Sequence, residues 1–324
     1  EKVGWHFGFG AAGVGMLFGV TQFILFRHQL GEAGKYPNKI NEKTKKNYIR
    51  GVGLVVVLIA SVVITGMAGF WSIDPVYFAE RFRDFLVVIS IIYFIYLLLF
   101  AGLTANEKKN VLMLLLLFIG AAAFWSGFDQ SAGSLTIFTR DYVNLTFGTF
   151  TAPVSWTQFV NPLFVVMFAP FFAYLWVFLG KRNLDPNMPI KFGLGLILMA
   201  LGFIVMILAV KYALASSPVG VQWLLLTYLL HTFGELTLSP VGLSAFSKYS
   251  PKRYLGQMMG IWFLASSLGG VLAGLLGGEA TESGLESMSP VFTELVYYCL
   301  AIAAVLIVLS FFIKGAKTDN IPDK

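Results

Sequence analysis

The chain has 324 residues, of which 57% are hydrophobic and only 12% are charged. A water-soluble domain of this size needs a polar surface around its core, and this composition cannot supply one. The formal charge of +6 could favour nucleic acid, but the basic residues follow the membrane topology described below. The composition predicts a polytopic membrane protein without a nucleic-acid partner.

Nine apolar segments are long enough to cross a bilayer, which takes about 20 residues in a helix. Their faces are apolar all round, and their length excludes barrel strands of about 10 residues, so we expect an all-α fold. The predicted helices are 5–26, 51–71, 84–104, 110–138, 156–180, 189–212, 220–247, 254–277 and 291–313. The polar and aromatic segment 139–155 is expected to form an external loop.

Basic residues are concentrated in alternate loops. The segments 27–50, 105–109, 181–191 and 248–253, with the tail from Lys314, hold 18 of the 23 Lys and Arg. Because cytoplasmic loops of membrane proteins are enriched in Lys and Arg, the C-terminus is predicted to be cytoplasmic. Nine spans then place the N-terminus outside. An external start without a signal peptide leads us to expect further spans upstream.

Glu235 lies near the middle of the apolar run from Gly220 to Phe246. A carboxylate at mid-bilayer depth costs about 2.5–3.5 kcal/mol on insertion scales, so it is retained where it has a function. Gly234 and Pro240 are expected to weaken this helix, as at many binding sites near the bilayer midplane. Facing water, Glu235 can hold an ammonium group; in a dry site it can carry a proton. A purely structural role is the third possibility.

Asp129 is a second acid inside an apolar run, nearer the external end of its span. The visible spans offer no Lys or Arg to pair with it. The sequence therefore predicts a protonated carboxyl, an ion pair with an upstream base, or a carboxylate wetted at the mouth of the span. Two isolated intramembrane carboxylates favour a transporter that handles a cation, a proton or both.

Other polar groups lie in the predicted spans. His231, four residues before Glu235, could relay protons, although packing is the more common role of one histidine among aromatic residues. Asn161 offers two donors and an acceptor, either to a ligand or between helices. Trp262 and Ser266 share a helix at a spacing that suits a pocket wall or core packing. Close helix approaches are predicted at the glycine repeats 15–19 and 270–278.

The sequence carries none of the common enzyme motifs. It contains no phosphate-binding loop, no His-Glu-x-x-His and no Gly-x-Ser-x-Gly. The single cysteine, Cys299, excludes a disulfide framework and a cysteine-based metal site. No cofactor, metal or enzymatic activity is expected.

Four motifs, spread over several predicted spans in the family's order, resemble the proton-dependent oligopeptide transporter family of the major facilitator superfamily. They are Phe-Trp125-Ser-Gly-Phe-Asp129-Gln130, Val160-Asn161-Pro162-Leu-Phe, Gly-Glu235-Leu-Thr-Leu-Ser239-Pro240-Val-Gly242-Leu and Gln257-Met258-Met259-Gly-Ile-Trp262-Phe-Leu. The resemblance covers the whole chain and implies the facilitator fold, with nine of its transmembrane helices visible here.

The resemblance also implies a domain organisation. Residues 1–26 would be the last helix of an N-terminal bundle, 27–50 a basic cytoplasmic linker, 51–104 two linker transmembrane helices and 105–324 a six-helix C-terminal bundle. Five upstream spans would be absent. These five spans would carry the acids and Arg of the first span and the groups that hold the peptide carboxylate, so those residues would be absent as well.

The resemblance further implies roles for individual residues. Glu235 would bind the amino terminus of a peptide, with Asn161 as a neighbouring hydrogen-bonding group and Trp262 in the wall of a side-chain pocket. Asp129, where many relatives have Glu, would belong to an external-gate ion-pair switch. The expected substrate-binding set is Glu235, Asn161, Trp262, Ser239 and Ser266, and the expected coupling and gating set is Asp129, Glu235, Trp125 and Gln130.

The expected function is that of a proton-coupled symporter that imports di- and tripeptides across the bacterial inner membrane by alternating access. Its partners would be peptides, protons, membrane lipids and the N-terminal bundle. Two alternatives remain open. One is a facilitator carrier for another solute, such as nitrate or an organic cation, and the other is a non-transporting membrane scaffold.

Overall fold

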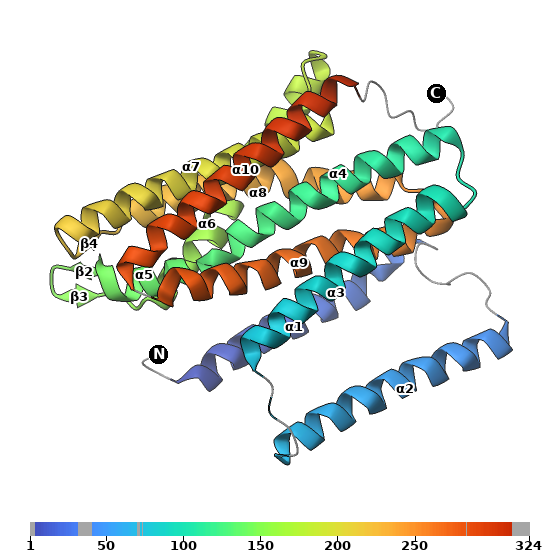
Figure 1. The fold of residues 1–324 in the computed structure, drawn as a ribbon, viewed down its shortest axis with the longest axis horizontal. Coiled ribbons are helices and arrows are strands. Elements are labelled where there is room, and N and C mark those ends of the chain that lie inside the picture. The colour runs from blue at the N-terminus through green and yellow to red at the C-terminus, as the bar shows by residue number, and fades with distance from the viewer. Residues whose placement is uncertain (1–3, 32–40, 70–71, 73, 283, 313–324) are drawn as a thin grey trace. The chain divides into compact units, whose positions relative to one another are not determined.

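The computed structural model describes residues 4–31, 41–69, 72, 74–282 and 284–312. In these parts of the chain nine long helices are present, as the sequence predicts (Figure 1). They are α1 (Trp5–Phe26), α2 (Glu42–Met67), α3 (Pro75–Ile95), α4 (Ala105–Phe128), α6 (Ser155–Lys181), α7 (Met188–Ala215), α8 (Gln222–Tyr249), α9 (Leu255–Glu282) and α10 (Leu285–Phe312). The expected all-α architecture is confirmed.

Shorter elements connect the long helices. They are the 3₁₀ turns η1 (Arg27–Leu30), η3 (Asp129–Ser131) and η4 (Lys252–Tyr254), the π-helical turn η2 (Tyr96–Phe100), the helix α5 (Ser134–Tyr142), and the strands β1 (Val143–Asn144), β2 (Thr146–Phe147), β3 (Phe150–Thr151) and β4 (Val219–Gly220). β1 pairs with β4 in parallel, and β2 pairs with β3 in antiparallel. Figure 1 shows these strands with α5 at one end of the bundle formed by α4 and α6–α10.

Hydropathy separates α8 from the other long helices. Eight helical segments of the described chain are apolar and long enough to cross a membrane, and α8 is not among them. Three of its polar side chains, His231, Thr232 and Glu235, lie within five residues of one another at mid-helix. The one long helix outside this set is thus the helix that carries the candidate carboxylate.

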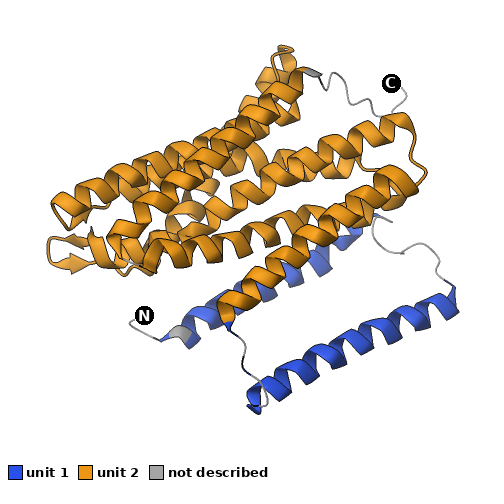
Figure 2. Ribbon diagram, in the orientation of Figure 1, with its two compact units in different colours: residues 1–74 blue, residues 75–324 orange. Residues whose placement is uncertain are grey.

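The chain divides into two compact units, residues 1–74 and 75–324 (Figure 2). In the first unit, no described side chain of α1 or α2 is buried. In the second unit, α3 buries Leu86, Ser90 and Phe94 and packs against α9. The two predicted linker helices therefore differ, because α3 packs with the bundle that follows it.

Within the second unit, α4 contacts α7, α8, α9 and α10, while α7 packs along both α8 and α10. The core between these helices is strongly aromatic, with Phe124, Phe192, Phe203 and Phe292 all fully buried. α6 packs against α8. This arrangement leaves one face of α8 against α7 and another against α6.

Two glycines bring α7 and α8 into close contact. A Cβ atom added to Gly234 would lie 2.8 Å from the carbonyl oxygen of Gly195, and one added to Gly195 would lie 3.1 Å from the carbonyl oxygen of Gly234. Small residues of this kind allow helix backbones to approach in membranes. This close approach holds α8 against α7 at the residue next to Glu235.

The predicted helix 110–138 is wrong in one respect, because it is broken. α4 ends at Phe128, and η3 with Ala132 and Gly133 separates it from α5. The break follows the polar sequence Asp129-Gln130-Ser131 and the helix-disfavouring Gly133. The predicted loop 139–155 is likewise partly structured, since α5 extends to Tyr142 and β1–β3 follow.

Within the second unit, the predicted glycine repeat 270–278 does not mediate a close approach of two backbones, whereas the prediction for the repeat 15–19 in the first unit stays a prediction. A Cβ atom at Gly274 or Gly278 would meet nothing within 4 Å. At Gly270 it would lie 3.2 Å from Oδ2 of Asp129, a side chain and not a neighbouring backbone. The close approaches occur instead at glycines that sit opposite large side chains or other backbones.

Candidate functional site

The candidate site is centred on Glu235, at the middle of the 28-residue helix α8. Its half-buried side chain faces α6, where Nδ2 of Asn161 donates a hydrogen bond of 3.1 Å to Oε2 of Glu235. The same amide nitrogen donates to Oγ1 of Thr232 at 3.0 Å. The structure thus brings together Glu235 and Asn161, which are 74 residues apart in the sequence.

Thr232 completes this small network. Its hydroxyl donates to the backbone carbonyl of Tyr228 at 2.7 Å and accepts from Asn161. The amide of Asn161 is therefore held by two acceptors on one face of α8. A carboxylate that accepts one hydrogen bond from a neutral amide still carries its full charge and has other lone pairs for a ligand.

Glu235 has no cationic partner among the described residues. The buried Lys191, near the start of α7, is already paired with Asp185, with 2.8 Å between Nζ and Oδ1. A half-buried carboxylate without a counter-ion is unfavourable in an apolar bundle. The site is therefore chemically suited to a cation or a proton from outside the described chain.

Pro240 does not break α8, which is helical from Gln222 to Tyr249. A proline has no N–H, so the carbonyl of Leu236, four residues earlier, lacks its usual helical donor. Ser239, between them, is half-buried. The helix therefore stays continuous through the turn in which a weakening was expected, and a substrate-binding role of Ser239 stays a prediction.

Trp262 lies in the interior of the bundle. Its ring is 5% exposed and packs against Phe246, with 5.4 Å between ring centroids, and against Phe192 at 6.4 Å. Its edge faces Gly242, where an added Cβ atom would lie only 2.2 Å from the indole. In this structure Trp262 packs between α7, α8 and α9, and its role in a pocket wall stays a prediction.

The contact between Gly242 and Trp262 gives a testable prediction about stability. Gly242→Ala places a methyl group inside the indole, so the ring or the helices must shift, and overpacking of this kind costs about 1–3 kcal/mol. We expect a lower melting temperature in detergent. Gly256→Ala, where an added Cβ meets nothing within 4 Å, is the matched control and should melt like the native protein.

Ser266 lies one helical turn after Trp262 on α9. Its hydroxyl donates to the carbonyl of Phe263 at 3.1 Å, within its own helix. No hydrogen bond in the described chain joins Ser266 to Asn161 or Glu235. The substrate-binding role expected for Ser266 stays a prediction.

Asp129 occupies the break after α4, where it is the first residue of η3. Its carboxyl is half-buried beside α9, near Gly270, and no described Lys or Arg pairs with it. A carboxylate at a helix C-terminus also lies at the negative end of the helix dipole. Both features disfavour an unpartnered charge and favour a proton or a base from outside the described chain.

Trp125 and Gln130 join the region around Asp129 to α9. Gln130 is fully buried, donates to the carbonyl of Ala273 at 3.0 Å and accepts from the hydroxyl of Ser134 at 2.7 Å. A Cβ atom added to Gly269 on α9 would lie 2.5 Å from Cβ of Trp125. Three of the four predicted coupling and gating residues, Trp125, Asp129 and Gln130, therefore lie along the interface with α9. The fourth, Glu235, is linked to none of them by a hydrogen bond or ion pair in the described chain.

His231 faces away from the polar network. Its buried ring lies 4.9 Å from the ring of Phe203 and against Gly202, both on α7. Glu235 instead contacts α6, so the two side chains share no hydrogen bond in the described chain. The geometry favours the packing interpretation of His231 over the proton relay.

Sequence reasoning missed Thr232 and Tyr298. Thr232 is one of several threonines on α8, and only the position of Asn161 reveals its role. The hydroxyl of Tyr298 on α10 is hydrogen-bonded to the hydroxyl of Ser126 on α4. Thr232 and Ser126 each lie three residues before an intramembrane acid, and this spacing could have drawn attention to both. No comparable signal in the sequence points to Tyr298.

Comparison with known proteins identifies the family. The POT family profile matches residues 1–285. The chain is 35% identical over 320 residues to the peptide transporter YePEPT of Yersinia enterocolitica, covering 94% of the chain and 61% of that protein. It is 34% identical over 277 residues to a di-/tripeptide transporter of Lactococcus lactis, covering 82% and 54%.

The fold also matches solved structures. A crystal structure of the peptide transporter POT in complex with sulfate superposes with a TM-score of 0.82 at 31% identity, covering 98% of this chain and 63% of that one. The described helices therefore have the arrangement of a facilitator-superfamily transporter, and the resemblance found in the sequence is confirmed. The chain spans about three fifths or less of each of these relatives. It belongs to the POT family, a family of multi-pass membrane transporters and not of enzymes.

Proposed function

We propose that the chain forms the C-terminal bundle, the linker helices and the last N-bundle helix of a proton-coupled symporter for di- and tripeptides. The observation that carries this proposal is the half-buried Glu235 at mid-helix, oriented by Asn161 and without a described counter-ion. The names of its relatives support a peptide as the substrate.

A short peptide has a positive amino terminus and a negative carboxyl terminus. Glu235 supplies an anionic group that fits the amino terminus, and charge-assisted hydrogen bonds of this kind are among the strongest in proteins. The carboxyl terminus would then be held by the N-terminal bundle. The two bundles would rock against each other, so that the bound peptide is exposed first to one side of the membrane and then to the other. Asp129 would couple this cycle to protons.

The proposed location is the bacterial inner membrane with a cytoplasmic C-terminus. It rests on the 18 basic residues in one set of alternate loops. If α8 crosses the membrane together with the eight apolar helices, the number of spans is odd and the two ends of the chain would lie on opposite sides.

Uptake into proteoliposomes tests the function. The full-length protein should accumulate a labelled dialanine when an inward proton gradient is imposed, and unlabelled di- and tripeptides should compete. N-acetylated dialanine should compete poorly because it lacks the ammonium. Competition by nitrate, or by organic cations without a peptide bond but not by peptides, would assign another solute, and absence of any uptake would favour the scaffold.

A further inference from the structure

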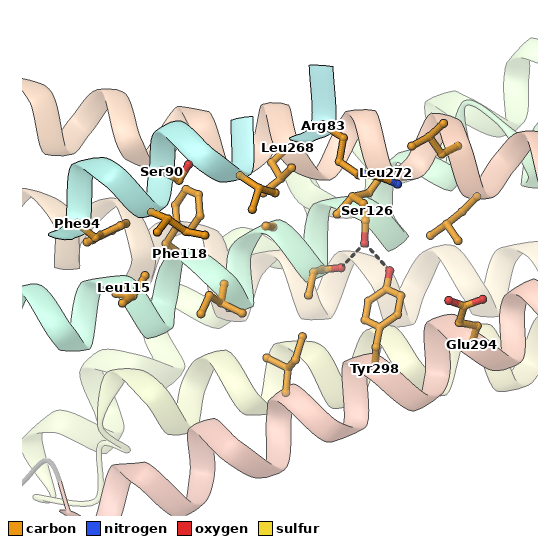
Figure 3. A pocket seen from close by; sticks show the side chains of 18 of the residues that line it. Arg83, Ser90, Phe94, Leu115, Phe118, Ser126, Leu268, Leu272, Glu294 and Tyr298 are labelled. Atoms are coloured by element: carbon orange, nitrogen blue, oxygen red, sulfur yellow. Dashed lines mark hydrogen bonds between the residues drawn. The ribbon is translucent and has the colours of Figure 1, made fainter. Parts of the chain in front are cut away.

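A groove separate from Glu235 lies between α3 and the bundle. It has a volume of about 630 Å³, and α3, α4, α9 and α10 all contribute to its walls. Most of its lining is aliphatic or aromatic, including Phe94, Phe118 and Leu272 (Figure 3). None of the residues expected to bind a peptide lines it.

The charged residues of the groove are gathered toward one end, whereas the hydroxyl residue Ser90 lies near Phe94. Arg83 and Glu279 lie toward that end on α3 and α9, Glu294 lies there on α10, and Ser126 with Tyr298 follows. Figure 3 shows Phe94 and Leu115 at the opposite end from Glu294. With the C-terminus in the cytoplasm, the charged end faces the external side. The groove is therefore amphipathic along the direction of the membrane normal.

The length of the groove matches one leaflet of a bilayer. On α3 the lining extends from Arg83 to Phe94, and on α4 from Ser126 to Leu115, eleven residue steps in each case. Eleven steps correspond to about 16 Å of helix rise. Half of a hydrocarbon core of about 30 Å is roughly 15 Å. An acyl chain of the external leaflet can thus lie along the groove with its headgroup at the charged end.

The charges at the mouth distinguish between headgroups. Arg83 donates to Asp84 through Nε and Nη2, at 3.1 and 2.9 Å, which leaves the protons of Nη1 for an additional acceptor such as a phosphate. Glu279 and Glu294 have no ion-pair partner among the described residues. One cation and two unpaired carboxylates are complementary to a phosphate that is joined to a primary ammonium.

We propose that this groove binds a phospholipid of the external leaflet whose headgroup is zwitterionic with a primary ammonium, as in phosphatidylethanolamine. The phosphate contacts Arg83, the ammonium is held by Glu279 and Glu294, and an acyl chain lies between α3 and α4. A trimethylated ammonium cannot donate to the carboxylates, and a headgroup without an ammonium leaves them unpaired. The lipid would fasten α3 to the bundle.

Native mass spectrometry of the purified full-length protein tests this site. Phosphatidylethanolamine, phosphatidylcholine and phosphatidylglycerol with identical acyl chains are added in turn. We expect preferential retention of phosphatidylethanolamine, by about tenfold if one charge-assisted hydrogen bond decides it. The joint change Glu279→Gln and Glu294→Gln should remove the preference, whereas Glu282→Gln, outside the groove, should preserve it.

Matched variants test the apolar part. Val87→Trp narrows the groove and should reduce retention of the lipid, whereas Val88→Trp, on an exposed part of α3 outside the lining, should not. A phosphatidylethanolamine with a photoreactive acyl chain should label peptides that contain Leu115, Leu272 or Ile302. Peptide uptake by each variant shows that it is folded.

Three results of the lipid experiments would overturn the proposal. They are equal retention of the three lipids, equal behaviour of Val87→Trp and Val88→Trp, and photolabelling confined to residues outside the groove. A protein–protein crosslink from the groove to upstream spans, in place of lipid labelling, would likewise assign the groove to the N-terminal bundle.

Discussion

Glu235→Gln is expected to abolish or severely weaken the binding of peptides that have a free amino terminus. The amide keeps the shape of the side chain and can still accept from Nδ2 of Asn161, but it has no charge to pair with the ammonium. Charge-assisted hydrogen bonds contribute about 1.5–3 kcal/mol, which corresponds to roughly a tenfold to a hundredfold increase in Kd or more. Binding of a dipeptide to the purified full-length variant, measured by calorimetry, checks this.

Two controls separate charge from structure in this experiment. Glu282→Gln makes the same chemical change at an exposed end of α9 and should bind like the native protein. N-acetylated peptides should bind the native protein and the Glu235→Gln variant equally poorly. Native affinity for a free dipeptide in the Glu235→Gln variant would show that another group holds the amino terminus.

The removal of the Asn161 amide should have a smaller effect. Asn161 donates hydrogen bonds to Glu235 and Thr232, so its loss removes the group that orients the carboxylate but leaves the negative charge of Glu235 in place. A variant Asn161→Leu that binds as weakly as Glu235→Gln would mean that the amide itself contacts the peptide as strongly as the carboxylate does.

The long helices could be predicted from the sequence because membrane helices must satisfy their own backbone and present apolar faces. Glu235 and Asp129 could be found for the same reason, since a charge is conspicuous in an apolar run. The position of Asp129 in a helix break could not be predicted from length alone. It depends on the polar residues Asp129 to Ser131 and on Gly133, which interrupt a run that is otherwise apolar enough to continue.

The contacts between particular helices could not be predicted from the sequence. The bond from Asn161 to Glu235 and the packing of His231 against Phe203 depend on which face of α8 meets α6 and which meets α7. The same holds for the glycines. Gly234 and Gly242 lie opposite a backbone and an indole, whereas the regular repeat at 270–278 meets no neighbouring backbone among the described residues.

Asp129→Asn is expected to lose proton-driven uphill uptake while peptide counterflow exchange continues. The side chain lies in the break after α4, and no hydrogen bond joins it to Glu235 or Asn161 in the described chain, so its loss should not remove a peptide contact. As a carboxyl at a helix C-terminus without a described counter-ion, it can alternate between a protonated form and an ion pair with an upstream base. An amide can do neither.

Both assays should be run on one reconstituted preparation of the full-length protein, so that the amount of inserted protein cancels. Asp141→Asn is the matched control, because Asp141 is paired with Arg140 at 2.7 Å on α5 and should leave both assays unchanged. Equal loss of uphill uptake and exchange in Asp129→Asn would assign Asp129 to peptide binding or to structure. Retention of uphill uptake would place the proton coupling elsewhere. The candidates would then be Glu235, the other intramembrane carboxyl of this chain, and the charged residues expected in the N-terminal bundle.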